Sequence, residues 1–130
     1  MTDTAQATET LVRDFLDAWT TRDLDTICSA FADDAVYHNV PVDPVAGITD
    51  IRAIFQAFLD AFAEAKLDIV SLAAAPGLAL VERVDYFTLN DGGKVELPVT
   101  GVFETANGKI TRFSDYFDLA DFERQSGFKL

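Results

Sequence analysis

An arginine and an aspartate stand two residues apart in the stretch VERVDYF, at residues 81–87. Because side chains alternate between the two faces of a strand, Arg83, Asp85 and Phe87 would share one face. On a solvent-facing surface an Arg–Asp pair is ordinary and contributes little. Inside a cavity, the same carboxyl group could donate or accept a proton in catalysis.

Two further stretches place polar residues on one strand face. Tyr37 and Asn39 alternate in YHN, and Asp115 stands between Phe113 and Phe117 in FSDYF. Taken singly, each pattern is more often surface or core structure, but two aromatic neighbours indicate an inward face for Asp115. Burying an unpaired carboxylate costs several kcal/mol, and a planar guanidinium can bridge two carboxylates. We therefore expect one cavity that contains Tyr37, Asn39, Arg83, Asp85 and Asp115.

Two carboxyl groups around one arginine could supply an acid and a base together. Two full negative charges in a cavity outweigh one positive charge, so the pair would share a proton. No metal or cofactor is expected, because His38 is the single histidine and its strand parity turns it away from the other polar residues. Cys28 lies in a helical pattern and is expected to be a small buried hydrophobic residue.

The hydrophobic periodicity predicts elements that could hold these residues in place. Strands gathered after helices indicate an α+β fold, here a single domain of residues 1–130. A curved, mostly antiparallel sheet packed on three N-terminal helices would form a cone with an apolar cavity. The predicted elements are helices at 5–21, 24–30 and 49–62, a short strand at 35–39, long strands at 66–75, 78–89, 94–105 and 109–119, and a short helix in 119–130.

Composition excludes several partners. The net charge of −12, from ten basic and twenty-two acidic residues, would repel nucleic acid and an anionic membrane surface. One cysteine allows no disulfide within the chain, and no apolar run approaches the about 20 residues of a spanning helix. The N-terminal stretch MTDTAQATET does not have the pattern of a signal peptide. We expect a cytoplasmic protein.

Four segments, YHNVP, VERVDYF, LPVTGVFE and GKITRFSDYFDL, together resemble the motifs of limonene-1,2-epoxide hydrolases. This family belongs to the nuclear transport factor 2-like superfamily, which also contains SnoaL-like cyclases and ketosteroid isomerases. The resemblance runs from about residue 8 to residue 122. It implies the same cone-shaped fold, a homodimer, and hydrolysis of a small apolar epoxide by water to a vicinal diol.

The resemblance also implies a role for each polar residue of the expected cavity. Asp115 would be the general base that activates a water held by Tyr37 and Asn39. Asp85 would be the acid that protonates the epoxide oxygen, and Arg83 would bridge the two carboxyl groups. This one-step route would need neither a metal nor a covalent intermediate.

One position departs from the family pattern. The family tends to carry Trp two residues before the base, whereas this chain has Phe113, which lacks an indole N–H for the substrate oxygen or a carboxylate. Phe113, Phe87 and Phe117 are expected to line the substrate pocket. Their apolar rings favour a terpene-like or alicyclic epoxide.

Three other functions remain open on the same fold. A ketosteroid isomerase needs a neutral carboxyl donor, and Arg83 beside Asp85 works against one. A SnoaL-type cyclase with a His–Asp pair would need a histidine that points into the cavity. The strand alternation places His38 on the face opposite to Tyr37 and Asn39, which argues against this function. A non-catalytic ligand-binding module would have little reason to bury three charged groups around a water.

Overall fold

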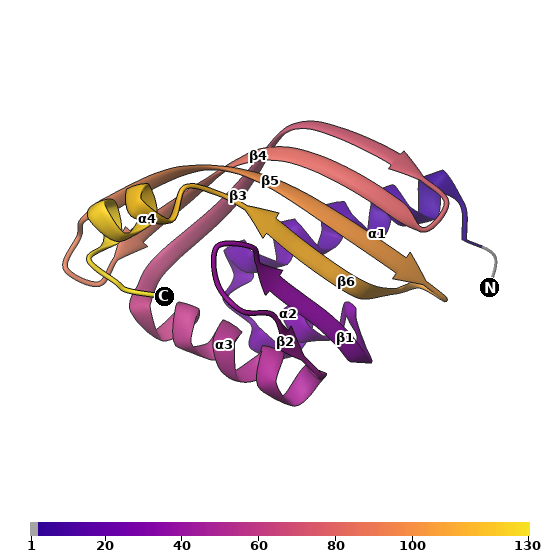
Figure 1. The fold of residues 1–130 in the computed structure, drawn as a ribbon, viewed down its shortest axis with the longest axis horizontal. Coiled ribbons are helices and arrows are strands. Elements are labelled where there is room, and N and C mark those ends of the chain that lie inside the picture. The colour runs from indigo at the N-terminus through magenta and orange to yellow at the C-terminus, as the bar shows by residue number, and fades with distance from the viewer. Residues whose placement is uncertain (1–2) are drawn as a thin grey trace.

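The computed structural model describes residues 3–130, so the first two residues of the expected domain lie outside it. Six strands form one curved sheet, and four α-helices accompany it (Figure 1). This arrangement confirms the predicted α+β class. The elements in chain order are α1 (Ala5–Ala18), a 3-10 turn η1 (Trp19–Thr21), α2 (Leu24–Cys28), β1 (Phe31–Asn39), β2 (Val45–Ala46), α3 (Ile48–Ala61), β3 (Phe62–Ala75), β4 (Leu78–Leu89), β5 (Lys94–Ala106), β6 (Lys109–Tyr116) and α4 (Leu119–Ser126).

The sheet is mixed, with the strand order β2-β1-β6-β5-β4-β3. The four long strands β3 to β6 form an antiparallel meander joined by short turns, as their alternating pattern predicts. β1 lies against β6 and runs parallel to it. A strand from the N-terminal half of the chain therefore comes to lie beside the last strand.

Helix α1 begins at a capped end and buries one apolar face. The side-chain oxygen of Thr4 accepts the backbone N–H of Ala7 at 2.9 Å, which satisfies one of the free donors of the first turn. Val12, Phe15 and Leu16 recur with helical spacing and are buried. The predicted helical stripe therefore becomes one wall of the core.

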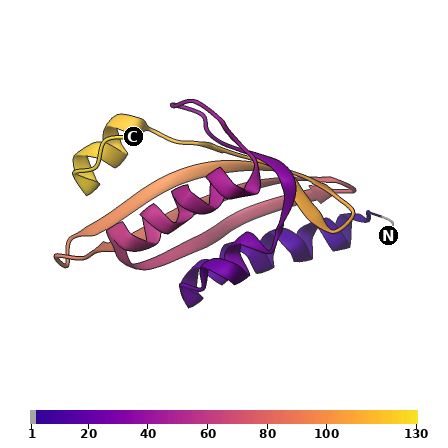
Figure 2. The ribbon, with the colours of Figure 1, turned by 90° about the horizontal axis from the view of Figure 1, so that it is seen from below.

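Helix α3 supplies a second wall. Its buried residues, Ile51, Phe55 and Leu59, recur every four positions on one helix face. In Figure 2, α3 crosses in front of the long strands and α1 runs alongside them. The two helices and the sheet enclose the apolar interior that the sequence pattern predicts.

Several element boundaries differ from the sequence expectation. Helix α2 ends at Cys28 instead of residue 30, β1 begins at Phe31 instead of residue 35, and β6 ends at Tyr116 instead of residue 119. The sequence predicts no helix or strand between residues 39 and 49, but Val45 and Ala46 form the short strand β2 against β1. Two residues are too few for an alternating pattern to show. Strand β3 begins at Phe62, directly after α3, because Phe62 already pairs with Leu89 of β4. In the sequence, Phe62 also fits the apolar stripe of the preceding helix.

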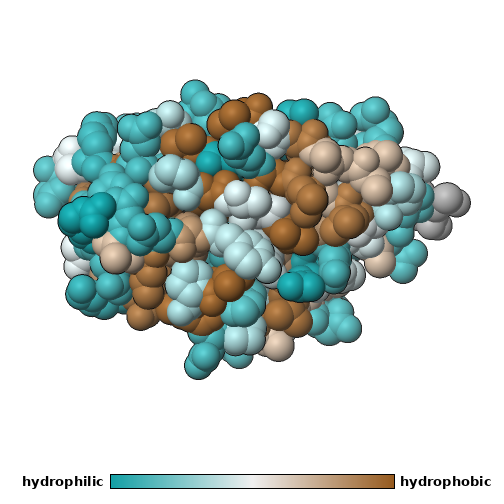
Figure 3. All heavy atoms as spheres, turned by 45° about the horizontal axis from the view of Figure 1, so that its top comes forward, coloured by the Kyte–Doolittle hydropathy of each residue, from teal (hydrophilic) through white to brown (hydrophobic). Residues whose placement is uncertain are grey.

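The long strands present a second face that α1 and α3 do not cover. Exposed apolar and aromatic side chains lie on it among charged ones, as the alternating burial of β4 and β5 requires. Figure 3 shows hydrophobic side chains interspersed with hydrophilic ones on the side where these strands lie. Exposed members of this set are Val70, Leu80, Tyr86 and Tyr116. Within residues 3–130, no helix is both long and apolar enough to cross a membrane.

Candidate active site

Arg83 binds both predicted carboxylates in the interior of the cone. Its Nε and Nη2 donate to the two oxygens of Asp85 at 2.7 and 3.1 Å. Its Nη1 and Nη2 donate to the two oxygens of Asp115 at 2.8 and 2.6 Å. All three residues are buried, with Arg83 only 2% exposed. The guanidinium thus forms paired hydrogen bonds on each side, an arrangement that lysine could not make.

Tyr37 and Asn39 lie beside this ion-paired group because of the parallel pairing of β1 with β6. In that register Tyr37 stands opposite Phe113, and Asn39 stands opposite Asp115. The Tyr37 hydroxyl donates to Oδ1 of Asn39 at 2.9 Å. The structure therefore brings together all five predicted polar residues, which come from three strands.

Burial controls the proton affinity of two of these groups. Burial raises the pKa of Asp85 to about 6, although Arg83 acts in the opposite direction. Arg83 does work against a neutral carboxyl group, as the sequence predicts, but the loss of hydration outweighs the neighbouring cation. Burial, reinforced by Asp115, also raises the pKa of the Tyr37 phenol, so Tyr37 keeps its proton. Asp85 can carry a proton near neutral pH, as a general acid must.

The cation itself is held in its charged form. Burial alone would lower the pKa of Arg83, but Asp115 and Asp85 outweigh that effect and raise it. The guanidinium also lies over the ring of Phe113, with Cζ 5.7 Å from the ring centroid. A permanent positive charge therefore stands between the two carboxyl groups.

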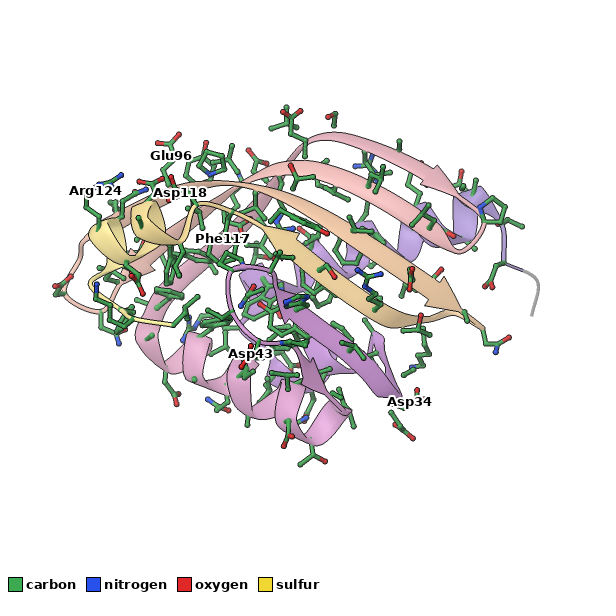
Figure 4. All side chains as sticks on the ribbon, in the orientation of Figure 1. Asp34, Asp43, Glu96, Phe117, Asp118 and Arg124 are labelled. Atoms are coloured by element: carbon green, nitrogen blue, oxygen red, sulfur yellow. The ribbon has the colours of Figure 1, made fainter. Side chains whose placement is uncertain are left out.

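The expected aromatic residues line the pocket above these polar groups. Phe87, Phe113 and Phe117 all contribute to its wall. Phe113 is stacked between Phe103, with ring centroids 4.4 Å apart, and Tyr37, at 5.2 Å. Phe117 directly follows β6, where the chain turns toward α4 (Figure 4). The pocket thus has polar groups on the sheet and apolar rings around them.

Sequence reasoning did not assign several other residues to the pocket wall. Their helical or alternating patterns indicated burial, but burial alone does not separate a pocket wall from a closed core. Trp19 differs from the rest, since its indole nitrogen has no hydrogen-bond partner among residues 3–130. These additional lining residues are Trp19, Phe55, Phe58, Phe62, Leu67, Leu97, Val99, Phe122 and Leu130.

Glu82, His38 and Cys28 do not line the pocket, as strand parity predicts for His38. Glu82 is exposed on the other face of β4 and accepts a hydrogen bond from the Ser71 hydroxyl at 2.8 Å. Nε2 of His38 lies 2.9 Å from the carbonyl oxygen of Val42, apart from the pocket wall. Cys28 is buried, and this burial raises the pKa of its thiol. In the described part of the chain, no three His, Cys, Asp or Glu side chains are grouped as metal ligands.

Comparison with known proteins gives consistent results. Residues 6–126 match the family model of the limonene-1,2-epoxide hydrolase catalytic domain. The chain is 32% identical over 110 residues to epoxide hydrolase EphG of Mycobacterium tuberculosis, covering 85% of this chain and 72% of that protein. A solved structure of an M. tuberculosis LEH-like epoxide hydrolase has a TM-score of 0.81 and 30% identity, covering 95% of this chain and 90% of the other.

More distant structures share the fold alone. A Catenulispora acidiphila protein with a ketosteroid isomerase-like fold, solved in complex with trimethylamine, has a TM-score of 0.79 and 21% identity. The match covers 91% of this chain and 92% of that protein. Because one fold hosts many activities, such a likeness does not identify a reaction.

Proposed function

The chain belongs to the limonene-1,2-epoxide hydrolase family, and we propose that, as an epoxide hydrolase, it converts an apolar epoxide to a vicinal diol in one step. The observation that carries this proposal is the set of four hydrogen bonds from Arg83 to Asp85 and Asp115. Opening an epoxide requires a base for the attacking water and an acid for the departing oxygen. Two carboxyl groups around one buried cation meet both needs.

Asp115 and Asp85 take opposite roles in this reaction. A water oxygen attacks one epoxide carbon while its proton passes to Asp115. The bond from that carbon to the epoxide oxygen breaks, and Asp85 donates its proton to that oxygen. The diol leaves with Asp115 protonated and Asp85 ionised, and one proton must return from Asp115 to Asp85 before the next turnover. Arg83, bound to both groups throughout, balances the one carboxyl group that is ionised at each stage, so the net charge of the three side chains stays at zero.

Tyr37 and Asn39 are proposed to position the water. The phenol oxygen and the amide of this hydrogen-bonded pair offer donors and acceptors next to Asp115, which is the register partner of Asn39. A water bound there can give one hydrogen to Asp115 and still present a lone pair to the substrate. Orienting the nucleophile in this way lowers the entropic part of the barrier.

The pocket wall favours a terpene-like or alicyclic substrate. Its apolar side chains, including Phe87 and Phe117, surround a small polar floor. An apolar ring or isoprenoid group would gain free energy by leaving water for this wall. The epoxide oxygen is the one polar atom that such a substrate needs to place near Asp85.

Product analysis tests the reaction, and oxygen labelling tests its mechanism. Purified protein is incubated with limonene oxide, cyclohexene oxide and a steroid enone, and diol or isomerised enone is measured. We expect diol from at least one epoxide and no isomerisation. In a single turnover in H₂¹⁸O, the diol should carry the label at once. An unlabelled first-turnover diol would indicate a covalent carboxylate ester, and enone isomerisation without diol would favour the isomerase alternative.

We also propose that two chains pair through the uncovered face of the sheet. Leu80, Tyr86, Tyr116 and Val70 are partly exposed there and would be covered by a second copy. Val95, Leu97 and Val99 are buried on the inner face and are not available to a partner. Light scattering after size-exclusion chromatography should give a dimer mass, and Leu80→Glu should reduce it to the monomer mass. A monomeric wild-type protein would refute the pairing.

A further inference from the structure

The contact between Arg83 and Asp115 crosses a strand that contributes neither residue. Arg83 is on β4 and Asp115 is on β6, and β5 lies between them. Neighbouring strands are about 4.8 Å apart, so the two backbones are separated by about 10 Å. The guanidinium must therefore extend over β5 to reach its partner.

The residue of β5 at the crossing is Gly101. It pairs with Val81 on one side and with Asp115 on the other. Register partners point to the same face of a sheet, so a side chain at residue 101 would point into the cavity beside Arg83. A strand interior is an unusual place for glycine, which often marks a close approach of another group.

A single added carbon at this position would collide with the ion pair. A Cβ built on Gly101 would lie 2.7 Å from Nη1 of Arg83 and 2.9 Å from Oδ1 of Asp115. It would also lie 3.3 Å from a ring carbon of Phe103. Gly101 is not among the residues with positive φ, so its backbone conformation does not itself require glycine. Glycine is therefore explained by the lack of room for a side chain between residue 101 and the Arg83–Asp115 pair, and not by the backbone conformation.

The guanidinium has little freedom to make room. Its side chain is 1% exposed, and Phe113 lies against it. The atom nearest to the added carbon, Nη1, is the one that donates to Oδ1 of Asp115. Moving Nη1 away from residue 101 would therefore lengthen or break that hydrogen bond.

We propose that Gly101 is a positioning residue of the active site, whose missing side chain lets Arg83 cross β5 and hold Asp115 in place. This inference rests on the proposed function for its catalytic consequence. Gly101 touches neither water nor substrate in this role and acts through Arg83 and Asp115. A shift of about 1 Å in a catalytic group can cost about 100-fold in rate.

The first experiment compares Gly101→Ala with Thr100→Ala, the neighbouring residue that is exposed on the opposite face. kcat and KM for an epoxide that the wild type hydrolyses are measured, with circular dichroism and melting temperature as checks of folding. We expect a fall in kcat of about 100-fold for Gly101→Ala, with KM changed less than threefold. Thr100→Ala should keep kcat within twofold. A folded Gly101→Ala variant with wild-type kcat would overturn the proposal.

A second experiment tests whether Gly101 acts through the guanidinium. Melting temperatures are measured at pH 5 for the wild type, Gly101→Ala, Arg83→Met and the double variant. We expect Gly101→Ala to lower the melting temperature when Arg83 is present and to have a much smaller effect in the Arg83→Met background. Equal losses in both backgrounds would overturn the proposal. This cycle needs no substrate, so it decides the role of Gly101 even if the wild type hydrolyses no epoxide, a result that would instead refute the proposed function.

Discussion

Arg83 and Asp115 are joined by two hydrogen bonds across an intervening strand, from Nη1 to Oδ1 at 2.8 Å and from Nη2 to Oδ2 at 2.6 Å. The two residues lie 32 positions apart in the chain. Because the pair is buried, it links the stability of the sheet to the chemistry of the pocket. Replacing a buried member leaves the other charge unpaired, which is strongly destabilising.

Asp115→Asn should lower kcat for epoxide hydrolysis by about 10²- to 10⁴-fold, because the amide cannot accept a proton from the attacking water. The variant keeps the size of the side chain and one hydrogen-bond acceptor for Arg83. Glu82→Gln removes a carboxylate from the exposed face of β4 and should leave kcat unchanged. Diol formation is measured for both variants and the wild type. Full activity of Asp115→Asn would show that the mechanism is wrong.

The rate of hydrolysis should fall as pH rises above about 6. Burial raises the pKa of Asp85 to about 6, so the proposed acid loses its proton above that value. A profile of kcat between pH 5 and pH 9 should show this descending limb. Asp85→Asn should lack the limb and have a low rate throughout. A rate that stays constant from pH 5 to pH 8 would contradict the assignment of Asp85 as the acid.

Asp85 should also make folding stability depend on pH. Its pKa is raised from 3.8 to about 6, so the folded state holds a proton that the unfolded state releases. Asp85 therefore adds about 3 kcal/mol to the free energy of unfolding at low pH. This contribution is fully present below pH 3.8 and is lost as pH rises through 6. Urea unfolding of the wild type and Asp85→Asn at pH 4 and pH 7 measures it. Relative to the variant, the wild type should become less stable at pH 7; a constant difference would argue against the shift.

Arg83→Lys should destabilise the fold by about 1–3 kcal/mol and lower kcat, because an ammonium group keeps the charge but cannot bind both carboxylates in pairs. The matched control is Arg13→Lys. Arg13 forms an exposed ion pair with Glu9, and this exchange should change stability by less than about 0.5 kcal/mol. Urea unfolding at pH 7 gives both values. Similar small losses for the two variants would mean that the buried bridge contributes little.

Phe113→Trp, which restores the residue that the family tends to carry, should destabilise this chain by about 1–3 kcal/mol. Phe113 is 3% exposed and stacked between Phe103 and Tyr37, so a larger ring would displace one of them. Phe128→Trp, at a ring that is 40% exposed, serves as the control and should change stability little. Thermal unfolding compares the two. No loss in Phe113→Trp would show that the pocket has room for an indole.

Local pattern was sufficient to predict most of the elements and the inward faces of the site strands. Period-two alternation places Arg83 and Asp85 on one face of β4, and the flanking rings identify the inner face at Asp115. These features depend on residues two positions apart, so they can be read along the chain. The short strand β2 and the early start of β3 could not be read in this way, because pairing with another strand defines them.

The sequence by itself therefore determined the fold class, the strand face on which each polar residue lies, and the likeness to an epoxide hydrolase family. Only the tertiary structure decided that Arg83 holds both carboxylates, that β1 lies parallel to β6, and that Gly101 leaves the space between. Parity shows which way a side chain points but not which strand lies beside it. The balance of burial and charge at Asp85 is likewise a property of the folded interior, because hydration is lost only when the whole cone closes around the carboxyl group.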